Sequence, residues 1–382
     1  MKNPLQKRYK RELRQDLGKY IAIFLFMVLS IGFISGFLVA GTSMKAAYDQ
    51  SFKKYNIEDG HFILKEKADK DLIKTLQDDE HVKLYSQPYI EEKATDDNTY
   101  RIYANRSKVN KISVLSGRMA KADDEIAIDR LFAENNDIKV GDSIQLDGTS
   151  WKVCGLVAFS DYSALFEDNS DLMFDAQTFT VAAVTRGGFD AMAENLKKLD
   201  DGSTQTRSLH YNYAWKWEKQ GMSEQTRRDK SDDLLSKLVK EAFFSDNEVK
   251  DFLQEADNQA IHFSGNDLGG DKQMVIWFMY IITAMLAFVF AVTTLNTIEK
   301  EAMVIGTLRA SGYTRAELIR HYMTLPVIIT LIACVIGNIL GYSFFKNTVA
   351  TLYYGSYSLP TYKTLWNPEA FLLSTLGPEI IM

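Results

Sequence analysis

The chain alternates between long apolar runs and segments that are rich in charge. Three runs contain no Asp, Glu, Lys, Arg or His, and they cover residues 20–44, 273–298 and 322–345. About 20 apolar residues are enough for a helix to cross a hydrocarbon core about 30 Å thick. A buried core helix is the alternative for each run, but such helices are usually shorter and carry polar residues on one face. We therefore predict three transmembrane helices.

A secretory signal peptide is a second interpretation of the first run, because basic residues precede it. Its apolar core is longer than the roughly 7 to 15 residues of a signal peptide, and no small-x-small cleavage site follows. We expect an uncleaved first span.

The flanking charges predict the orientation of the spans. Residues 1–19 contain seven basic and two acidic residues, and the short loop 299–321 contains Lys300, Arg309, Arg315 and Arg320. Lys and Arg collect on the cytoplasmic side of membrane proteins. We therefore expect the N-terminus and this loop in the cytoplasm, and residues 45–272 and 346–382 outside it.

The large segment 45–272 has the pattern of a mixed α+β domain. Short β-branched or aromatic stretches bounded by Asp, Asn and Gly predict strands at 99–104, 125–128, 143–146 and 151–157, with a short helix at 129–135. The segment has a net charge near −12, which argues against nucleic acid or an anionic membrane surface as its partner. A cationic ligand is compatible with this charge.

Two further patterns occur late in this segment. Tyr211, Tyr213, Trp215 and Trp217 alternate along one predicted strand, which indicates either an aromatic binding face or side chains packed into a core. Apolar residues at helical spacing among many charges predict a helical insertion near 223–260. Its expected apolar positions are Leu234, Leu235, Leu238, Val239, Val249, Phe252 and Leu253.

The sequence offers no catalytic or metal-binding pattern. It contains no GxxxxGK[ST] phosphate-binding loop, so any ATP that drives the protein is expected to bind another subunit. The five histidines are scattered without ligand spacing, so we expect neither a metal site nor an enzyme. The two cysteines, Cys154 and Cys334, fall in the outer segment and the third run, and we expect no disulfide between them.

The loop that follows the second run carries apolar residues and two glycines. Met303, Val304, Ile305 and Leu308 form an apolar cluster that is followed by Gly312. This pattern predicts a short amphipathic helix at the inner membrane surface, of a kind that docks into a groove on another protein.

Within this loop, Ile305-Gly306-Thr307-Leu308-Arg309-Ala310-Ser311-Gly312 resembles the I-G-x-L-R-A-x-G motif of the FtsX-like permease family, which includes the MacB-type ABC permeases. In the outer segment, Gly117-Arg118, Asp124-Glu125-Ile126, Val140-Gly141-Asp142 and Val153-Cys154-Gly155-Leu156 are similar to the periplasmic core domain of those permeases. The family often has Glu before the Ile-Gly pair. This chain has Val304 there, so a salt bridge to the ATPase from that position is not implied.

The resemblance implies a permease subunit in a bacterial cell membrane, as a homodimer or pseudo-dimer bound to a cytoplasmic ABC ATPase. The coupling contact would then comprise Ile305, Gly306, Leu308, Arg309, Ala310 and Gly312. ATP-driven movement would be transmitted to the outer domain, with cargo handled outside the membrane. The family has a fourth span, whereas Ala370–Leu376 is too short to cross, so we expect an incomplete fourth span and a fragment or truncated permease.

Small residues at a spacing of four also suit close packing between helices. Gly32 and Gly36 lie in the first run, and Gly337 and Gly341 lie in the third. The alternative function is a membrane-anchored receptor or regulator of an envelope enzyme, with no transport activity.

Overall fold

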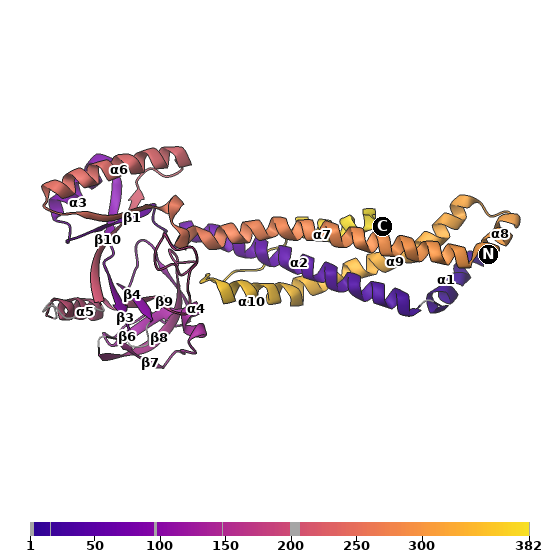
Figure 1. Ribbon diagram of the computed structural model, residues 1–382, viewed down its shortest axis with the longest axis horizontal. Helices are drawn as coiled ribbons and strands as arrows, with labels where there is room; N and C mark the ends of the chain where they lie inside the picture. Colours follow the sequence, from indigo (N-terminus) through magenta and orange to yellow (C-terminus); the bar gives the residue numbers. More distant parts are fainter. Residues whose placement is uncertain (1–3, 16, 95–97, 147, 199–206, 382) are drawn as a thin grey trace. The chain divides into compact units, whose positions relative to one another are not determined.

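The computed structural model describes residues 4–15, 17–94, 98–146, 148–198 and 207–381. The chain forms two compact units (Figure 1). The first, here called the helical unit, comprises residues 1–46, 267–353 and 362–382. The second, here called the sheet unit, comprises residues 47–266 and 354–361.

Three helices in the described part of the chain are long and apolar enough to cross a membrane, over Leu17–Lys54, Gln259–Lys300 and Arg315–Ser356. They are α2 (Leu17–Lys54), α7 (Gln259–Lys300) and the combination of α9 (Arg315–Leu340), a π-helical turn (Gly341–Phe345) and α10 (Lys346–Ser356). Each contains one of the charge-free runs, so the prediction of helices there is confirmed. All three extend beyond the apolar runs, because an absence of charge marks the part suited to hydrocarbon and does not mark where a helix ends. Residues 346–356, expected in an outer loop, continue the third helix.

Shorter helices complete the helical unit. They are α1 (Pro4–Gln15), α8 (Ala302–Ala310) and α11 (Pro368–Ile381). The 14 residues of α11 correspond to about 21 Å of helix, which is less than the thickness of a hydrocarbon core. The helix also includes Gly377 and Pro378, which follow the apolar stretch Ala370–Leu376.

The long helices of this unit share an apolar core. Ile23 and Met27 from α2 pack with Leu286 and Phe290 from α7 and with Cys334 from α9, and the three helices run side by side (Figure 1). Most of the other apolar side chains on α7 and α9 are exposed, as expected for surfaces that face lipid.

The sheet unit is built on an 11-stranded sheet with the order β11-β1-β10-β3-β4-β9-β6-β8-β5, in which β2 also pairs with β10 and β7 with β8. The strands are β1 (Gly60–Leu64), β2 (Val82–Ser86), β3 (Tyr89–Lys93), β4 (Thr99–Ala104), β5 (Ile112–Gly117), β6 (Glu125–Asp129), β7 (Ser143–Leu146), β8 (Thr149–Phe159), β9 (Phe179–Val184), β10 (Arg207–Trp217) and β11 (Val249–Gln254). Its helices are α3 (Lys70–Glu80), α4 (Arg130–Asn135), α5 (Arg186–Lys198) and α6 (Glu224–Phe244). The four predicted strands coincide with β4, β6, β7 and β8, and the short predicted helix coincides with α4, so these predictions are confirmed.

One strand connects two separate cores in this unit. The first half of β10 pairs with β3, and the second half pairs with β1 and β2. One core gathers around β4, β6, β8 and β9, and includes Ile102, Phe132 and Phe179. The other lies where α3 and α6 cover β1 and β10, and includes Leu76 and Leu238 (Figure 1).

The predicted helical insertion is only partly correct. Helix α6 spans Glu224–Phe244, but residues 249–254 form the edge strand β11, which pairs with β1. Asp246 has a φ of +53°, a left-handed conformation that ends the helical path. The spacing of Val249, Phe252 and Leu253 predicts a helix, but pairing with β1 makes this segment a strand. Such a long-range contact overrides a local pattern.

Candidate functional site

The loop after α7 forms the helix α8, which carries most of the predicted coupling residues. None of its residues is buried, and the apolar side chain of Met303 is 87% exposed. Ile305 and Leu308 are partly covered, while Gly306, Arg309 and Ala310 are exposed. An exposed apolar side chain of this size on a short helix is typical of a surface that contacts lipid or another protein.

The end of α8 and the start of α9 are both defined by local chemistry. Gly312 has a φ of +97°, a conformation that glycine adopts without a side-chain clash. Thr314 then caps α9: its hydroxyl accepts a hydrogen bond from the backbone N–H of Glu317, and the Glu317 carboxylate accepts one from the backbone N–H of Thr314. The two helices are therefore separated by a turn with a fixed geometry.

The basic N-terminus contributes to the same end of the helical unit. Arg8 on α1 donates to the Glu301 carboxylate at 2.8 Å, and the Tyr322 hydroxyl donates to the same carboxylate at 2.6 Å. His321 lies 3.0 Å from Glu12. These contacts connect α1 to both sides of α8. The basic residues of this segment predict its orientation, but their spacing carries no signal for these contacts.

The two glycine pairs lie where α2 meets α9 and the π-helical turn that follows it. A Cβ on Gly36 would lie 2.5 Å from the Cβ of Phe345, and one on Gly341 would lie 2.7 Å from the Cβ of Ser35. A Cβ on Gly32 or Gly337 would lie 3.2 Å from a backbone carbonyl of the other helix. The absence of side chains at all four positions allows the two backbones to approach closely.

A buried polar contact lies beside these glycines. The amide oxygen of Asn338 on α9 accepts hydrogen bonds from Ser35 on α2 at 2.9 Å and from Ser374 on α11 at 2.8 Å. Polar side chains inside apolar helix bundles stabilise specific pairings when their hydrogen bonds are satisfied. This contact connects three helices at one level.

The aromatic face of β10 belongs to a core. Tyr213, Trp215 and Trp217 are buried in the core beneath α3 and α6, and Tyr211 is partly buried against it. Trp215 stacks on Phe252 of β11 with ring centroids 4.8 Å apart. The interpretation as an exposed binding face is therefore corrected, because these side chains are occupied by contacts within the domain.

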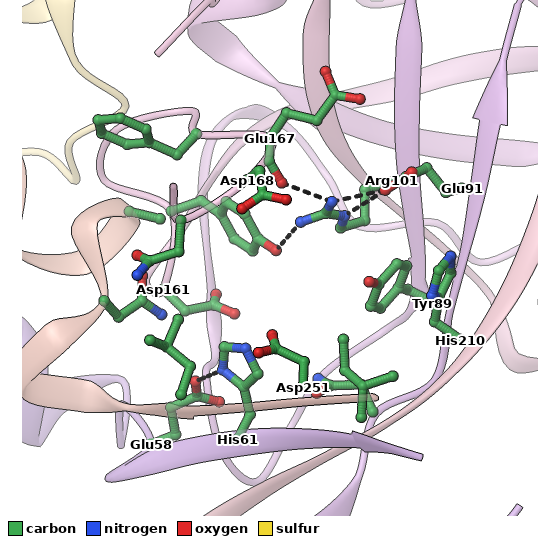
Figure 2. A pocket seen from close by; sticks show the side chains of 18 of the residues that line it. Glu58, His61, Tyr89, Glu91, Arg101, Asp161, Glu167, Asp168, His210 and Asp251 are labelled. Atoms are coloured by element: carbon green, nitrogen blue, oxygen red, sulfur yellow. Dashed lines mark hydrogen bonds and ion pairs between the residues drawn. The ribbon is translucent and has the colours of Figure 1, made fainter. Parts of the chain in front are cut away.

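The sheet unit contains a cavity of about 620 Å³, here called the acidic cavity, which no local pattern in the sequence indicates (Figure 2). Its lining comes from β1, β3, β4, β10 and β11 and from the segment after β8, so residues far apart in the sequence meet there. Six lining residues are acidic: Glu58, Glu91, Asp161, Glu167, Asp168 and Asp251. The only sequence signal that bears on it was the strong negative charge of the segment.

Several charges that line the acidic cavity are paired. The His61 ring lies 2.5 Å from the buried Glu58 carboxylate. Burial opposes protonation of His61, but the Glu58 carboxylate outweighs that effect, so the pKa of His61 is raised. Asp161 forms an ion pair at 2.6 Å with Arg106, which lies just outside the lining.

The segment 354–361, which follows α10, is built into the sheet unit. Arg130 on α4 donates to the carbonyl oxygens of Tyr354 at 2.7 Å and Tyr357 at 2.8 Å. The Ser358 hydroxyl donates to the buried Asp129 carboxylate. Burial raises the pKa of Asp129 to about 6, against the lowering effect of the hydrogen bond from Ser358.

The comparison with known families supports the resemblance that rests on the motif at residues 305–312. Residues 276–380 match the FtsX-like permease C-terminal family. This stretch contains most of α7, all of α8, α9 and α10, and nearly all of α11. It therefore includes the predicted coupling residues and the predicted packing glycines Gly337 and Gly341. No curated protein matches the chain. Over residues 276–380, the chain is therefore similar to the C-terminal domain of the FtsX-like permeases.

Proposed function

We propose that the chain is the permease subunit of an ABC-type transporter, in which α8 binds a separate cytoplasmic ATPase. The observation that carries this proposal is the exposure of α8 within the part that matches the family. Its exposed apolar and basic residues would occupy a groove on the ATPase, which would bind the ATP. The chain itself would act without a cofactor and without enzymatic activity.

We further propose a multi-pass topology with the N-terminus in the cytoplasm. The positive flanks 1–19 and 299–321 support this orientation. The sheet unit, with its net negative charge, would then lie outside the cytoplasm of a bacterial cell. Its α+β fold is compatible with a MacB-like periplasmic core domain, which we propose for it.

Mechanical transmission is the proposed mode of action. The sheet unit includes the last residues of α2, the first residues of α7 and the segment that follows α10, so it is continuous with all three long helices. Hydrogen bonds hold these ends within the unit, such as that from the Tyr48 hydroxyl to the carbonyl of Ile261 at 3.1 Å. A tilt of the helices would therefore pull on folded parts of the domain. In a homodimer or pseudo-dimer, two such domains would move together.

A membrane-anchored receptor or regulator is the second proposal, and the acidic cavity is the observation that favours it. Purifying the tagged chain from its native membrane and identifying the co-purified proteins by mass spectrometry separates the two. We expect a cytoplasmic ABC ATPase among them. Recovery of envelope proteins without an ATPase would contradict the permease proposal and favour the receptor.

A further inference from the structure

The acidic cavity combines a buried polar floor with aromatic walls and an acidic rim. Glu58, Asp161 and Asn212 are buried on the floor, and Tyr89, Tyr103 and Tyr162 contribute to the walls. Asp168 and Asp251 are exposed at the rim. A concave site of this size, with a few polar groups directed into it, has the features of a pocket for a small ligand or for a side chain of a larger one.

Two carboxylates at the rim have no direct ion-pair partner among the described residues. Asp168 and Asp251 form no ion pair with any residue that the structure describes, whereas Glu58 and Asp161 are paired with His61 and Arg106. Figure 2 shows the carboxylates of Asp168 and Asp251 turned toward the space between His61 and Arg101, while the side chain of Glu167 points away from it.

The basic residues of the lining do not offset this excess. Lys250 forms its ion pair with Glu248, at 2.9 Å. Arg101 donates to Glu91 through Nε at 3.0 Å and through Nη2 at 2.7 Å. Its Nη1 donates to the Tyr162 hydroxyl at 3.0 Å. Since the guanidinium is already engaged on each nitrogen, it is poorly placed to bind an anionic ligand.

An unpartnered hydrogen-bond acceptor supports the same conclusion. Asn212 on β10 lines the cavity and is only 6% exposed, and its side-chain oxygen has no hydrogen-bond partner among the described residues. A buried amide oxygen that has lost its water without gaining a hydrogen-bond partner destabilises the folded protein. A ligand that donates hydrogen bonds would satisfy it.

The dimensions of the cavity argue for an organic cation over a metal ion. No group of three or more His, Cys, Asp or Glu side chains in the described part of the chain is arranged to hold a metal. The volume of about 620 Å³ exceeds what a single ion occupies. Arg101 and Arg106 already lie over the rings of Tyr89 and Tyr103, at 4.8 Å and 3.7 Å from the ring centroids, so these walls suit the apolar stem of a ligand and not its charged group.

We propose that the acidic cavity binds an organic cation, an alkylammonium or guanidinium group attached to an apolar stem. The charged group would contact Asp251 and Asp168 and donate a hydrogen bond to Asn212, while the stem would pack on the tyrosine walls. This inference concerns ligand recognition by the sheet unit and holds whether or not the chain works with an ATPase. A free polyamine and a basic side chain of a peptide present the same chemistry.

Isothermal titration calorimetry on the full chain in detergent tests the proposal. The probes are spermidine and the blocked tripeptide acetyl-Lys-Tyr-Lys-amide, and acetyl-Gln-Tyr-Gln-amide is the neutral control. We expect at least one cationic probe to bind, with an affinity that falls as salt is added, because the interaction is electrostatic. Binding of spermidine alone would indicate a free polyamine, and binding of the peptide alone a basic side chain.

Matched variants locate the binding to the acidic cavity. Asp251→Asn and Asp168→Asn each remove one charge with little change of shape, and we expect each to weaken binding by about tenfold or more. Asp233→Asn removes the same charge from an exposed position on α6 outside the cavity and should bind as the wild type does. Thermal melting checks that each variant is folded. If only one of the two rim variants folds, that variant alone tests the proposal. The proposal is overturned if neither cationic probe binds, if the glutamine peptide binds equally well, or if the folded rim variants retain wild-type affinity.

Discussion

At the scale of single residues, the glycines of α2 differ in what surrounds them. Gly36 lies against Phe345 and Lys346, whereas a Cβ on Gly41 in the same helix would have no atom within 4 Å. The two positions are therefore a matched pair in one helix, and only the first serves close packing.

We expect Gly36→Ala to lower the stability of the helical unit and Gly41→Ala to leave it unchanged or slightly raise it. Forcing a methyl group into a closely packed contact costs about 1 to 3 kcal/mol, whereas alanine stabilises an open helical site by about 0.5 to 1 kcal/mol relative to glycine. Thermal melting of the full chain in detergent measures both effects. Equal melting temperatures for the two variants would show that the approach of α2 to the π-helical turn does not depend on Gly36.

Asp129 gives a residue-scale prediction about pH. Its pKa is raised to about 6 in the folded protein, above the ordinary value of an aspartate, so folding favours the protonated carboxyl. Stability from this group is therefore present at low pH and is lost as the pH rises from about 4 to about 6, by about 3 kcal/mol in total. Asp129→Asn should remove this dependence while keeping an oxygen acceptor for Leu131.

Melting temperatures of the wild type and Asp129→Asn across this pH range provide the test. Relative to the variant, the wild type should become less stable as the pH rises. Parallel curves, or a wild type that gains stability with rising pH, would show that the carboxyl is not buried as described.

At the scale of elements, α8 carries the functional proposal. We expect replacement of Leu308 and Arg309 by alanine to abolish co-purification of the ATPase without affecting membrane insertion, because both side chains lie on the proposed contact helix. The matched control replaces Val239 and Lys240, an adjacent apolar and basic pair exposed on α6. Quantitative mass spectrometry of the purified chain measures the bound ATPase. Undiminished ATPase in the Leu308 and Arg309 variant would exclude α8 as the contact.

The elements also show which parts of the fold the sequence predicts. The three long helices were predictable because a charge-free run of this length has few alternatives. Strands such as β4 and β8 were predictable from local composition and flanking turns. The strand β11 was not, because its structure depends on pairing with β1, which is nearly 200 residues away. Alternation along β10 identified an aromatic face, but only the packing of α3 and α6 shows that this face is interior.

At the scale of the whole molecule, the sequence predicted the division between apolar helices and a large mixed domain. It did not predict that residues 354–361 would belong to the sheet unit, because this depends on hydrogen bonds to Arg130 and Asp129, far away in the chain. Nor did it predict the acidic cavity, whose lining comes from several separate strands and one loop. Both features arise from tertiary contacts with no local signature.

The proposed coupling requires that the sheet unit move relative to the helical unit when ATP binds. Spin labels at Lys363→Cys in the helical unit and Asp233→Cys in the sheet unit report this movement, since both positions are exposed and the native Cys154 and Cys334 are buried. The measurement is the distance between the labels by pulsed electron paramagnetic resonance, in the complex with its ATPase, without nucleotide and with ATP trapped. We predict two different distance distributions. The same distribution in both states would contradict mechanical transmission.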